Sequence, residues 1–150
     1  MNSKYTVIIK NNVLQYQFEI RKKVTILKGD SATGKTVLVN MIREYERYGE
    51  SSGIYMKCDK ACGVLDGTNW KIALENTDDF IFFIDEGNSF IFTDEFSDAV
   101  KKSNNYFVLI TRESLPKLEN SNHEIYGIRS LNRNNIARQI QQEFYLIEKH

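Results

Sequence analysis

The segment from Gly29 to Thr36 has the residue types and the spacing that phosphate binding requires. It reads G-D-S-A-T-G-K-T and matches the pattern G-x-x-x-x-G-K-[ST] in full. Glycine lets backbone N–H groups face an anion without a Cβ in the way, and a helix that begins here directs more N–H groups toward it. The pattern therefore predicts a loop around the phosphates of ATP or a similar nucleotide, formed by Gly29, Asp30, Ser31, Ala32, Thr33, Gly34, Lys35, Thr36 and Val37.

Two carboxylates follow the most apolar run of the chain, which extends from Phe80 to Ile84. A short apolar run that ends abruptly in Asp85, Glu86 and a glycine is typical of a central strand buried on both faces. A carboxylate beside a metal and a triphosphate can accept a proton from an attacking water. The alternative interpretation is a polar strand end followed by a turn.

Together the two motifs resemble the P-loop NTPase superfamily, in particular its ATPase branch, over residues Lys23 to Arg112. The resemblance implies that Thr36 and Asp85 hold Mg²⁺ and that Lys35 lies at the β- and γ-phosphates. It also implies that Glu86 polarises the attacking water. The cofactors expected on this basis are ATP and Mg²⁺.

The apolar run Tyr106–Ile110 ends in Thr111 and Arg112. It is similar to the strand that, in this ATPase branch, lies between the P-loop strand and the Walker B strand. The resemblance implies that Thr111 contacts the attacking water or the γ-phosphate and that Arg112 stabilises the charge that develops there. The alternative interpretation is that Thr111 and Arg112 are exposed polar residues at a strand end without a functional role. The catalytic residues expected from the resemblance are Lys35, Glu86, Thr111 and Arg112.

The sequence departs from several groups of this superfamily. It has no Leu-Ser-Gly-Gly-Gln-like signature of ABC transporters, no Asn-Lys-x-Asp motif for reading guanine and no arginine-rich lid of nucleoside kinases. After Arg112 there is no room for the helical lid of AAA-type proteins. These departures favour adenine over guanine and disfavour a small-molecule kinase.

The spacing of apolar residues and the positions of glycine and other turn residues predict the strands and helices that would hold these residues. A hairpin is predicted at the start, where strictly alternating residues 13–20 follow the strand 5–9. Other predicted strands are 24–27, 54–56, 80–84, 106–110 and 124–128. Predicted helices follow Gly34 and cover 69–76 and 93–103, and a terminal helix would present Ile136, Ile140, Phe144 and Ile147 on one side. We therefore expect one domain over 1–150, an α/β three-layer P-loop NTPase fold with a mostly parallel central sheet and the N-terminal hairpin at one edge.

Composition narrows the class of partner. The formal net charge is zero, which does not support nucleic-acid binding, although Arg21, Lys22, Lys23 and Lys28 form a local basic cluster. Cys58 and Cys62 are too few for a zinc site. No apolar run has the length of a signal peptide or a membrane span, so a cytoplasmic protein without membrane contact is expected.

Three functions remain open. The first is a small Mg²⁺-dependent ATPase that couples its nucleotide state to a protein partner or to a homo-oligomer. The second is a nucleotide-gated binding module with little or no hydrolysis, because the chain is short. The third is a P-loop kinase for a small molecule. Tyr16 in the hairpin is a candidate for stacking on the nucleotide base.

Overall fold

The computed structural model describes residues 4–28, 35–118, 122–131 and 140–149. Its strands form one sheet in the order β4-β1-β2-β9-β8-β3-β7-β6-β5. The strands are β1 (Tyr5–Lys10), β2 (Leu14–Ile20), β3 (Val24–Leu27), β4 (Tyr55–Cys58), β5 (Cys62–Val64), β6 (Ile81–Ile84), β7 (Tyr106–Ile110), β8 (His123–Leu131) and β9 (Ile140–Lys149). The helices are α1 (Lys35–Tyr48), α2 (Trp70–Glu75) and α3 (Asp94–Lys102), with short 3-10 helices at Gly49–Ser52 and Ser89–Phe92.

The sheet is mixed. Strands β5, β6, β7, β3 and β8 run parallel to one another, whereas β1 is antiparallel to both β2 and β4, and β9 is antiparallel to β8. β9 joins the two parts, because it also pairs in parallel with β2 over three residues, Ile140 to Gln142. The N-terminal hairpin is therefore built into the sheet, and β4 lies outside it.

The sheet is strongly curled. Its two edge strands, β4 and β5, follow each other in the sequence, and the short connection between them keeps the two edges of the sheet close together. Only Asp59, Lys60 and Ala61 connect β4 to β5. The backbone N–H of Asp59 donates to the carbonyl of Thr6 in β1 (3.1 Å), and the N–H of Ile81 in β6 donates to the carbonyl of Ala61 (2.9 Å). This short connection is thus hydrogen bonded to both sides of a nearly closed, barrel-like sheet.

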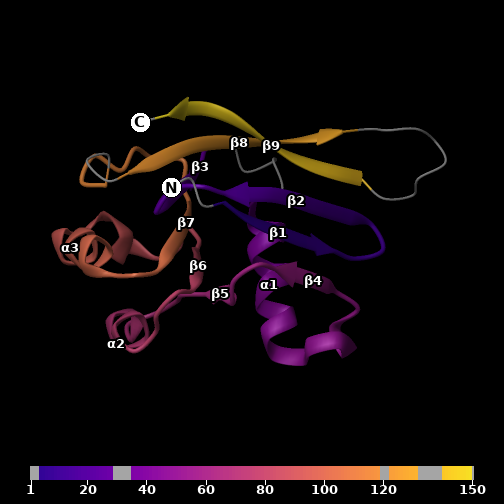
Figure 1. The fold of residues 1–150 in the computed structure, drawn as a ribbon, viewed down its shortest axis with the longest axis horizontal. Coiled ribbons are helices and arrows are strands. Elements are labelled where there is room, and N and C mark those ends of the chain that lie inside the picture. Colours follow the sequence, from indigo (N-terminus) through magenta and orange to yellow (C-terminus); the bar gives the residue numbers. More distant parts are fainter. Residues whose placement is uncertain (1–3, 29–34, 119–121, 132–139, 150) are drawn as a thin grey trace.

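The two faces of the sheet hold two separate clusters of buried side chains. Helix α1 packs inside the curl, where Leu38 and Ile42 lie in one cluster with residues of β1, β2, β6 and β7. We call this cluster the inner cluster. The opposite cluster includes Trp70 of α2 and Phe96 of α3. Figure 1 shows β5, β6 and β7 between α1 on one side and α2 and α3 on the other. Phe82 and Phe83 point into opposite clusters, which explains why this strand is apolar without alternation.

The expected fold class is wrong. The sheet is mixed and curled, with three antiparallel pairings, and is not the mostly parallel sheet of a three-layer P-loop NTPase fold with a hairpin added at its edge. The cause is long-range pairing that local patterns do not reveal. β9 inserts between β2 and β8, and this insertion places the hairpin inside the sheet.

The expected terminal helix is also wrong, because residues 140–149 form β9. Phe144 stacks on Phe18 with ring centroids 4.0 Å apart, and Gly127 opposite leaves room for the ring of Tyr145. β-branched and aromatic residues favour such pairing over helix. Ile136 lies outside the described residues. The predicted strands at 24–27, 80–84 and 106–110 are confirmed within one residue.

Helix α3 begins where the sequence predicts, because Thr93 caps it. The Thr93 hydroxyl accepts a hydrogen bond from the backbone N–H of Phe96 (3.1 Å) and donates to the carbonyl of Phe90 (2.7 Å). Thr93→Ala removes both, and we expect a loss of about 1 kcal/mol in the free energy of unfolding. Urea denaturation measures it, with the exposed Thr68→Ala as control. Equal stability of the two variants would show that the cap contributes nothing.

Candidate functional site

The carboxyl ends of β3, β6 and β7 meet at one edge of the sheet. β7 lies between the other two strands, as the resemblance implied, with Leu27 opposite Ile110 and Ile84 opposite Leu109. The backbone N–H of Thr111 donates to the carbonyl of Leu27 (3.1 Å). The residues that leave these strands are therefore neighbours: Lys28, Asp85 and Thr111. This is the edge at which the chain enters the predicted phosphate loop.

Most of the predicted phosphate loop, Gly29, Asp30, Ser31, Ala32, Thr33 and Gly34, lies outside the described residues. Lys35, Thr36 and Val37 form the first turn of α1. Lys35 is buried, with 2% of its surface exposed, whereas Thr36 and Val37 are exposed. The predicted helix after Gly34 is thus confirmed, and its lysine lies inside the protein instead of extending into solvent.

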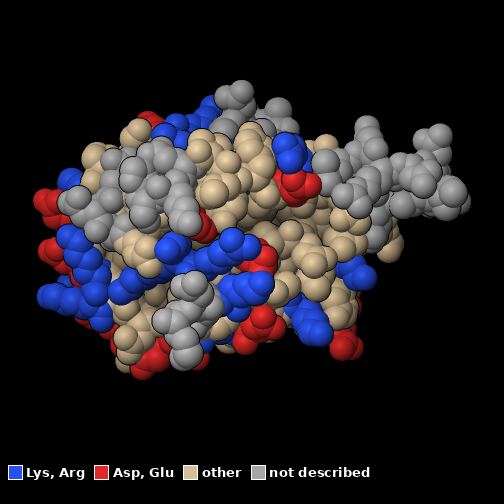
Figure 2. Space-filling model, turned by 45° about the horizontal axis from the view of Figure 1, so that its top comes forward, with Lys and Arg blue, Asp and Glu red and all other residues tan. Residues whose placement is uncertain are grey.

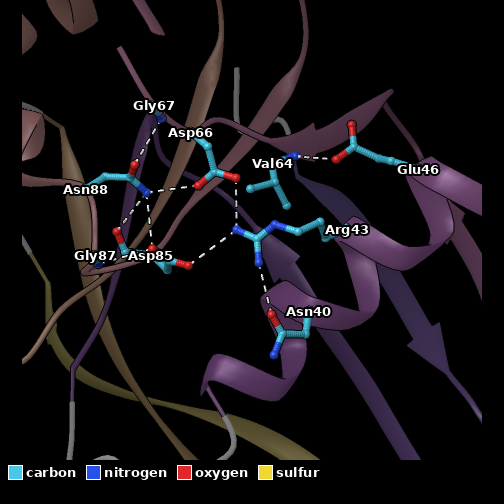
Figure 3. A network of polar contacts seen from close by, with 9 residues as sticks. All are labelled: Asn40, Arg43, Glu46, Val64, Asp66, Gly67, Asp85, Gly87 and Asn88. Carbon is cyan, nitrogen blue, oxygen red and sulfur yellow. Dashed lines mark hydrogen bonds and ion pairs between the residues drawn. The ribbon is translucent and has the colours of Figure 1, made fainter. Parts of the chain in front are cut away.

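Asp85 belongs to a polar network that α1 completes (Figure 3). Nη2 of Arg43 lies 2.9 Å from Oδ2 of Asp66 and 3.4 Å from Oδ2 of Asp85, while Nη1 donates to Asn40 at 2.9 Å. Burial alone would lower the pKa of Arg43, but the hydrogen bonds and charges of Asp66 and Asp85 outweigh this and raise it. The arginine thereby bridges two carboxylates that would otherwise repel each other.

Asn88 holds the other side of the two carboxylates. Its amide nitrogen donates to Oδ1 of Asp66 and to Oδ1 of Asp85, both at 3.1 Å, and its oxygen accepts from the N–H of Gly67 (3.2 Å). Oδ1 of Asp85 also accepts from the N–H of Gly87 (3.1 Å). The Asp85 carboxylate is therefore fixed in orientation by contacts to both of its oxygens.

Glu86 and Arg112 form an ion pair, with Nε and Oε1 3.5 Å apart and both side chains at least one-third exposed. Thr111 is fully buried. Its hydroxyl accepts from the N–H of Glu113 (2.9 Å) and donates to the carbonyl of the same residue (3.2 Å). Glu86, Thr111 and Arg112 are thus brought to one edge, but here the Thr111 hydroxyl is engaged within its own turn.

Sequence reasoning missed Arg43, Asp66 and Asn88. Asp66 lies shortly after β5, a strand of only three residues that no sequence pattern predicts. Had β5 been recognised as parallel to β6, its carboxyl end would have placed Asp66 beside Asp85. Arg43 and Asn40 are three residues apart on α1, the spacing at which helical side chains meet.

Tyr16 cannot stack on a nucleotide base, so that expectation is wrong. Its side chain is fully buried in the inner cluster, and burial raises its pKa to about 12. A tyrosine on the inner face of a curled sheet packs in the core instead.

Two members of the basic cluster ahead of the phosphate loop have polar partners. Arg21 pairs with Glu19 (3.0 Å), and the amine of Lys23 donates to the carbonyl of Lys101 (3.2 Å). Figure 2 shows Lys and Arg gathered over part of one face with acidic side chains among them. Two hollows, of about 410 and 390 Å³, are lined by Arg21 among others and by none of the predicted site residues.

The described residues contain neither a metal-ligand cluster nor a membrane-spanning helix. Within 4–28, 35–118, 122–131 and 140–149, no three His, Cys, Asp or Glu side chains group as metal ligands. The predicted Mg²⁺ ligands, Thr36 and Asp85, are two, and such sites take their remaining ligands from water and phosphate. None of the helices in these ranges is both long enough and apolar enough to cross a bilayer.

Comparison with known proteins assigns no family to the chain. A scan against models of protein families finds no match, and a search of curated proteins finds no significantly similar sequence. The function must therefore be argued from the site itself.

The Asp66–Arg43–Asp85 network predicts a salt-dependent loss of stability. Arg43→Met keeps an apolar stem but leaves two carboxylates facing each other, so we expect a loss of about 1 kcal/mol in the free energy of unfolding at low salt. The loss should shrink in high salt, because screening weakens that repulsion. Urea titrations at two salt concentrations measure it, with Arg47→Met on the same helix as control. A loss that does not vary with salt would assign the effect to packing.

Proposed function

We propose that this chain binds ATP with Mg²⁺ at the carboxyl edge of β3, β6 and β7, and that it is a small ATPase. One observation carries the proposal. The strand that leads into the phosphate-binding pattern and the strand that ends in Asp85 and Glu86 flank β7, so both motifs reach the same edge. A pattern and an acidic pair that had arisen by chance would have no reason to meet there.

The residues at this edge fit a triphosphate and its metal. The first turn of α1 places backbone N–H groups and the positive end of the helix dipole where an anion could bind. Lys35 brings a cation to the same place, and the Thr36 hydroxyl and the Asp85 carboxylate are the hard oxygen ligands that Mg²⁺ prefers. Bound Mg²⁺ would neutralise charge on the phosphates. A carboxylate has about four acceptor positions, so Asp85 can keep Arg43 and Asn88 and still hold a metal-bound water.

Glu86 is the candidate base for hydrolysis. Its ion pair with Arg112 is partly exposed, so its contribution to stability is small and the pair can open at little cost. Once released, the Glu86 carboxylate can take a proton from the attacking water, and the Arg112 guanidinium can turn to the developing negative charge. Thr111 would have to leave its turn with Glu113 to reach the same place.

The alternative is a nucleotide-gated binding module with little hydrolysis. The Glu86–Arg112 pair favours it, because the guanidinium occupies the carboxylate that would have to receive the proton. In this case the protein partner or the homo-oligomer would respond to bound ATP alone. A small-molecule kinase is supported by no residue at this edge beyond the shared phosphate pattern.

Titration of the protein with a fluorescent ATP analogue tests the proposal. We expect saturable binding with Mg²⁺ and weaker binding when EDTA removes the metal, and we expect unlabelled ATP to compete better than GTP. Release of inorganic phosphate, measured on the same sample, separates the ATPase from the binding module. Absence of saturable binding at millimolar nucleotide would reject both.

A further inference from the structure

The two cysteines lie at the point where the curled sheet comes nearest to closing. Cys58 is the last residue of β4 and Cys62 the first residue of β5, so each terminates one edge strand of the sheet. We call the segment from Cys58 to Cys62 the seam. Both cysteines are free thiols, and both are partly exposed.

The seam places the two thiols near each other. Only three residues separate Cys58 from Cys62, and both side chains pack against the inner cluster. Asp59 fixes the start of the connection, because its carboxylate accepts from the N–H of Thr6 (2.8 Å). The N–H of Val64 donates to Glu46 of α1 (2.9 Å), which fixes the far end (Figure 3). The strand ends that carry the two cysteines are thus fixed by hydrogen bonds that do not involve the thiols.

The environment makes the two thiols unequal. The hydrogen bond from Cys62 lowers the pKa of Cys58 to about 7, helped by the backbone N–H and the charge of Lys60 and opposed by burial and Asp59. The same hydrogen bond, burial and the nearby Glu46 raise the pKa of Cys62. The thiolate is the nucleophilic form of cysteine, so Cys58 is the reactive partner and Cys62 the thiol beside it.

We propose that Cys58 and Cys62 form an oxidation site for hydroperoxides, in which the Cys58 thiolate reacts first and a reversible disulfide to Cys62 then closes the seam of the sheet. The inference is independent of the proposed nucleotide site. It rests on the position of the two thiols at the ends of the edge strands and on their packing against the same cluster.

The chemistry balances with a hydroperoxide as the only oxidant. The Cys58 thiolate attacks one peroxide oxygen, the O–O bond breaks, and the leaving oxygen takes a proton as water or alcohol. Cys58 is then a sulfenic acid. The Cys62 sulfur attacks the Cys58 sulfur, the S–O bond breaks, and hydroxide leaves as water with the Cys62 proton. Two thiols have then lost two electrons to the peroxide.

Mass spectrometry of the full chain tests the first claim. The reduced protein is treated with a small excess of H₂O₂, and we expect the intact mass to fall by about 2 Da, with dithiothreitol restoring it. Peptide mapping should place the disulfide between Cys58 and Cys62. A protein that keeps both thiols reduced, or that gains oxygen atoms instead of forming the disulfide, would overturn the proposal.

Two serine variants test the order of reaction. Cys62→Ser keeps a hydroxyl donor beside Cys58 but removes the second sulfur, so the Cys58 sulfenic acid should persist and be trapped by dimedone. Cys58→Ser leaves only the less reactive thiol, and its dimedone adduct should form at least roughly ten times more slowly. Equal labelling of the two variants, or faster labelling of Cys58→Ser, would contradict Cys58 as the first site.

A thermal melt tests whether the disulfide closes the seam. The cross-link restrains the unfolded chain, so oxidised wild-type protein should melt roughly 3 °C or more above the reduced protein. Cys62→Ser treated in the same way controls for other effects of peroxide and should show no such rise. An oxidised wild type that melts below the reduced form would show that the bond distorts the seam.

Discussion

Lys35→Ala is expected to weaken ATP binding by roughly 10- to 100-fold. The lysine is the first residue of α1 and is almost fully buried, so its charge acts in a medium that screens less than water. A hydrogen bond to a charged group contributes about 1.5 to 3 kcal/mol, which corresponds to that range of affinity. Competition titration with the fluorescent analogue measures the change at fixed Mg²⁺.

Lys102→Ala is the matched control, because this lysine ends α3 and is exposed on the outer side of the sheet. It removes the same charge without touching the proposed site and should bind ATP as wild type does. Because Lys35 is buried, its removal also affects the core. The thermal melt of Lys35→Ala without nucleotide shows whether the variant is folded, and Lys35→Met, which keeps an apolar stem, separates lost charge from lost packing. A folded Lys35→Met with wild-type affinity would remove this lysine from nucleotide binding.

The sequence predicts the parallel strands well, for a physical reason. A strand buried on both faces must be apolar at every position. A continuous apolar run such as Tyr106–Ile110 therefore predicts such a strand from its composition alone. The polar residues that follow each apolar run then mark the carboxyl end of the strand. The order of the strands, and with it the expectation that Thr111 lies near Asp85 and Glu86, came from the resemblance to the ATPase branch.

The curl of the sheet could not be predicted in the same way. It depends on pairings between β9 and β2 and on β5, whose central Gly63 leaves no hydrophobic signal. A Cβ at Gly63 would lie 2.2 Å from Oε2 of Glu46, so a side chain there requires the Glu46 carboxylate of α1 to move aside. Such a requirement depends on a partner distant in sequence. Local patterns do not contain it.

The partners of Asp85 were missed for a related reason. Arg43 comes from the helix after the phosphate loop, and Asp66 from the end of the unrecognised β5. Each residue alone resembles a solvated surface charge. Only the topology shows that an arginine of α1 holds a carboxylate of the strand end in place, and so links the helix that begins at Lys35 to the proposed metal ligand.

Glu86→Gln is expected to lower the rate of ATP hydrolysis at least about 100-fold while leaving ATP affinity within a few-fold of wild type. Glutamine keeps the size of the side chain but cannot take a proton, and a positioned general base contributes about 10²- to 10⁴-fold to a rate. The substitution also breaks the ion pair with Arg112, which is partly exposed and contributes little to stability. Single-turnover phosphate release and the binding titration together measure both quantities.

Glu75→Gln, at the exposed end of α2, is the control and should hydrolyse ATP as wild type does. Arg112→Gln separates the two roles of the ion pair. If Arg112 only holds Glu86 inactive, this variant should hydrolyse ATP faster, whereas an arginine that stabilises the transition state should leave it slower. Wild-type turnover in Glu86→Gln would exclude Glu86 as the base. A wild-type protein that binds ATP without releasing phosphate would favour the binding module, in which Arg112 keeps Glu86 from acting as a base.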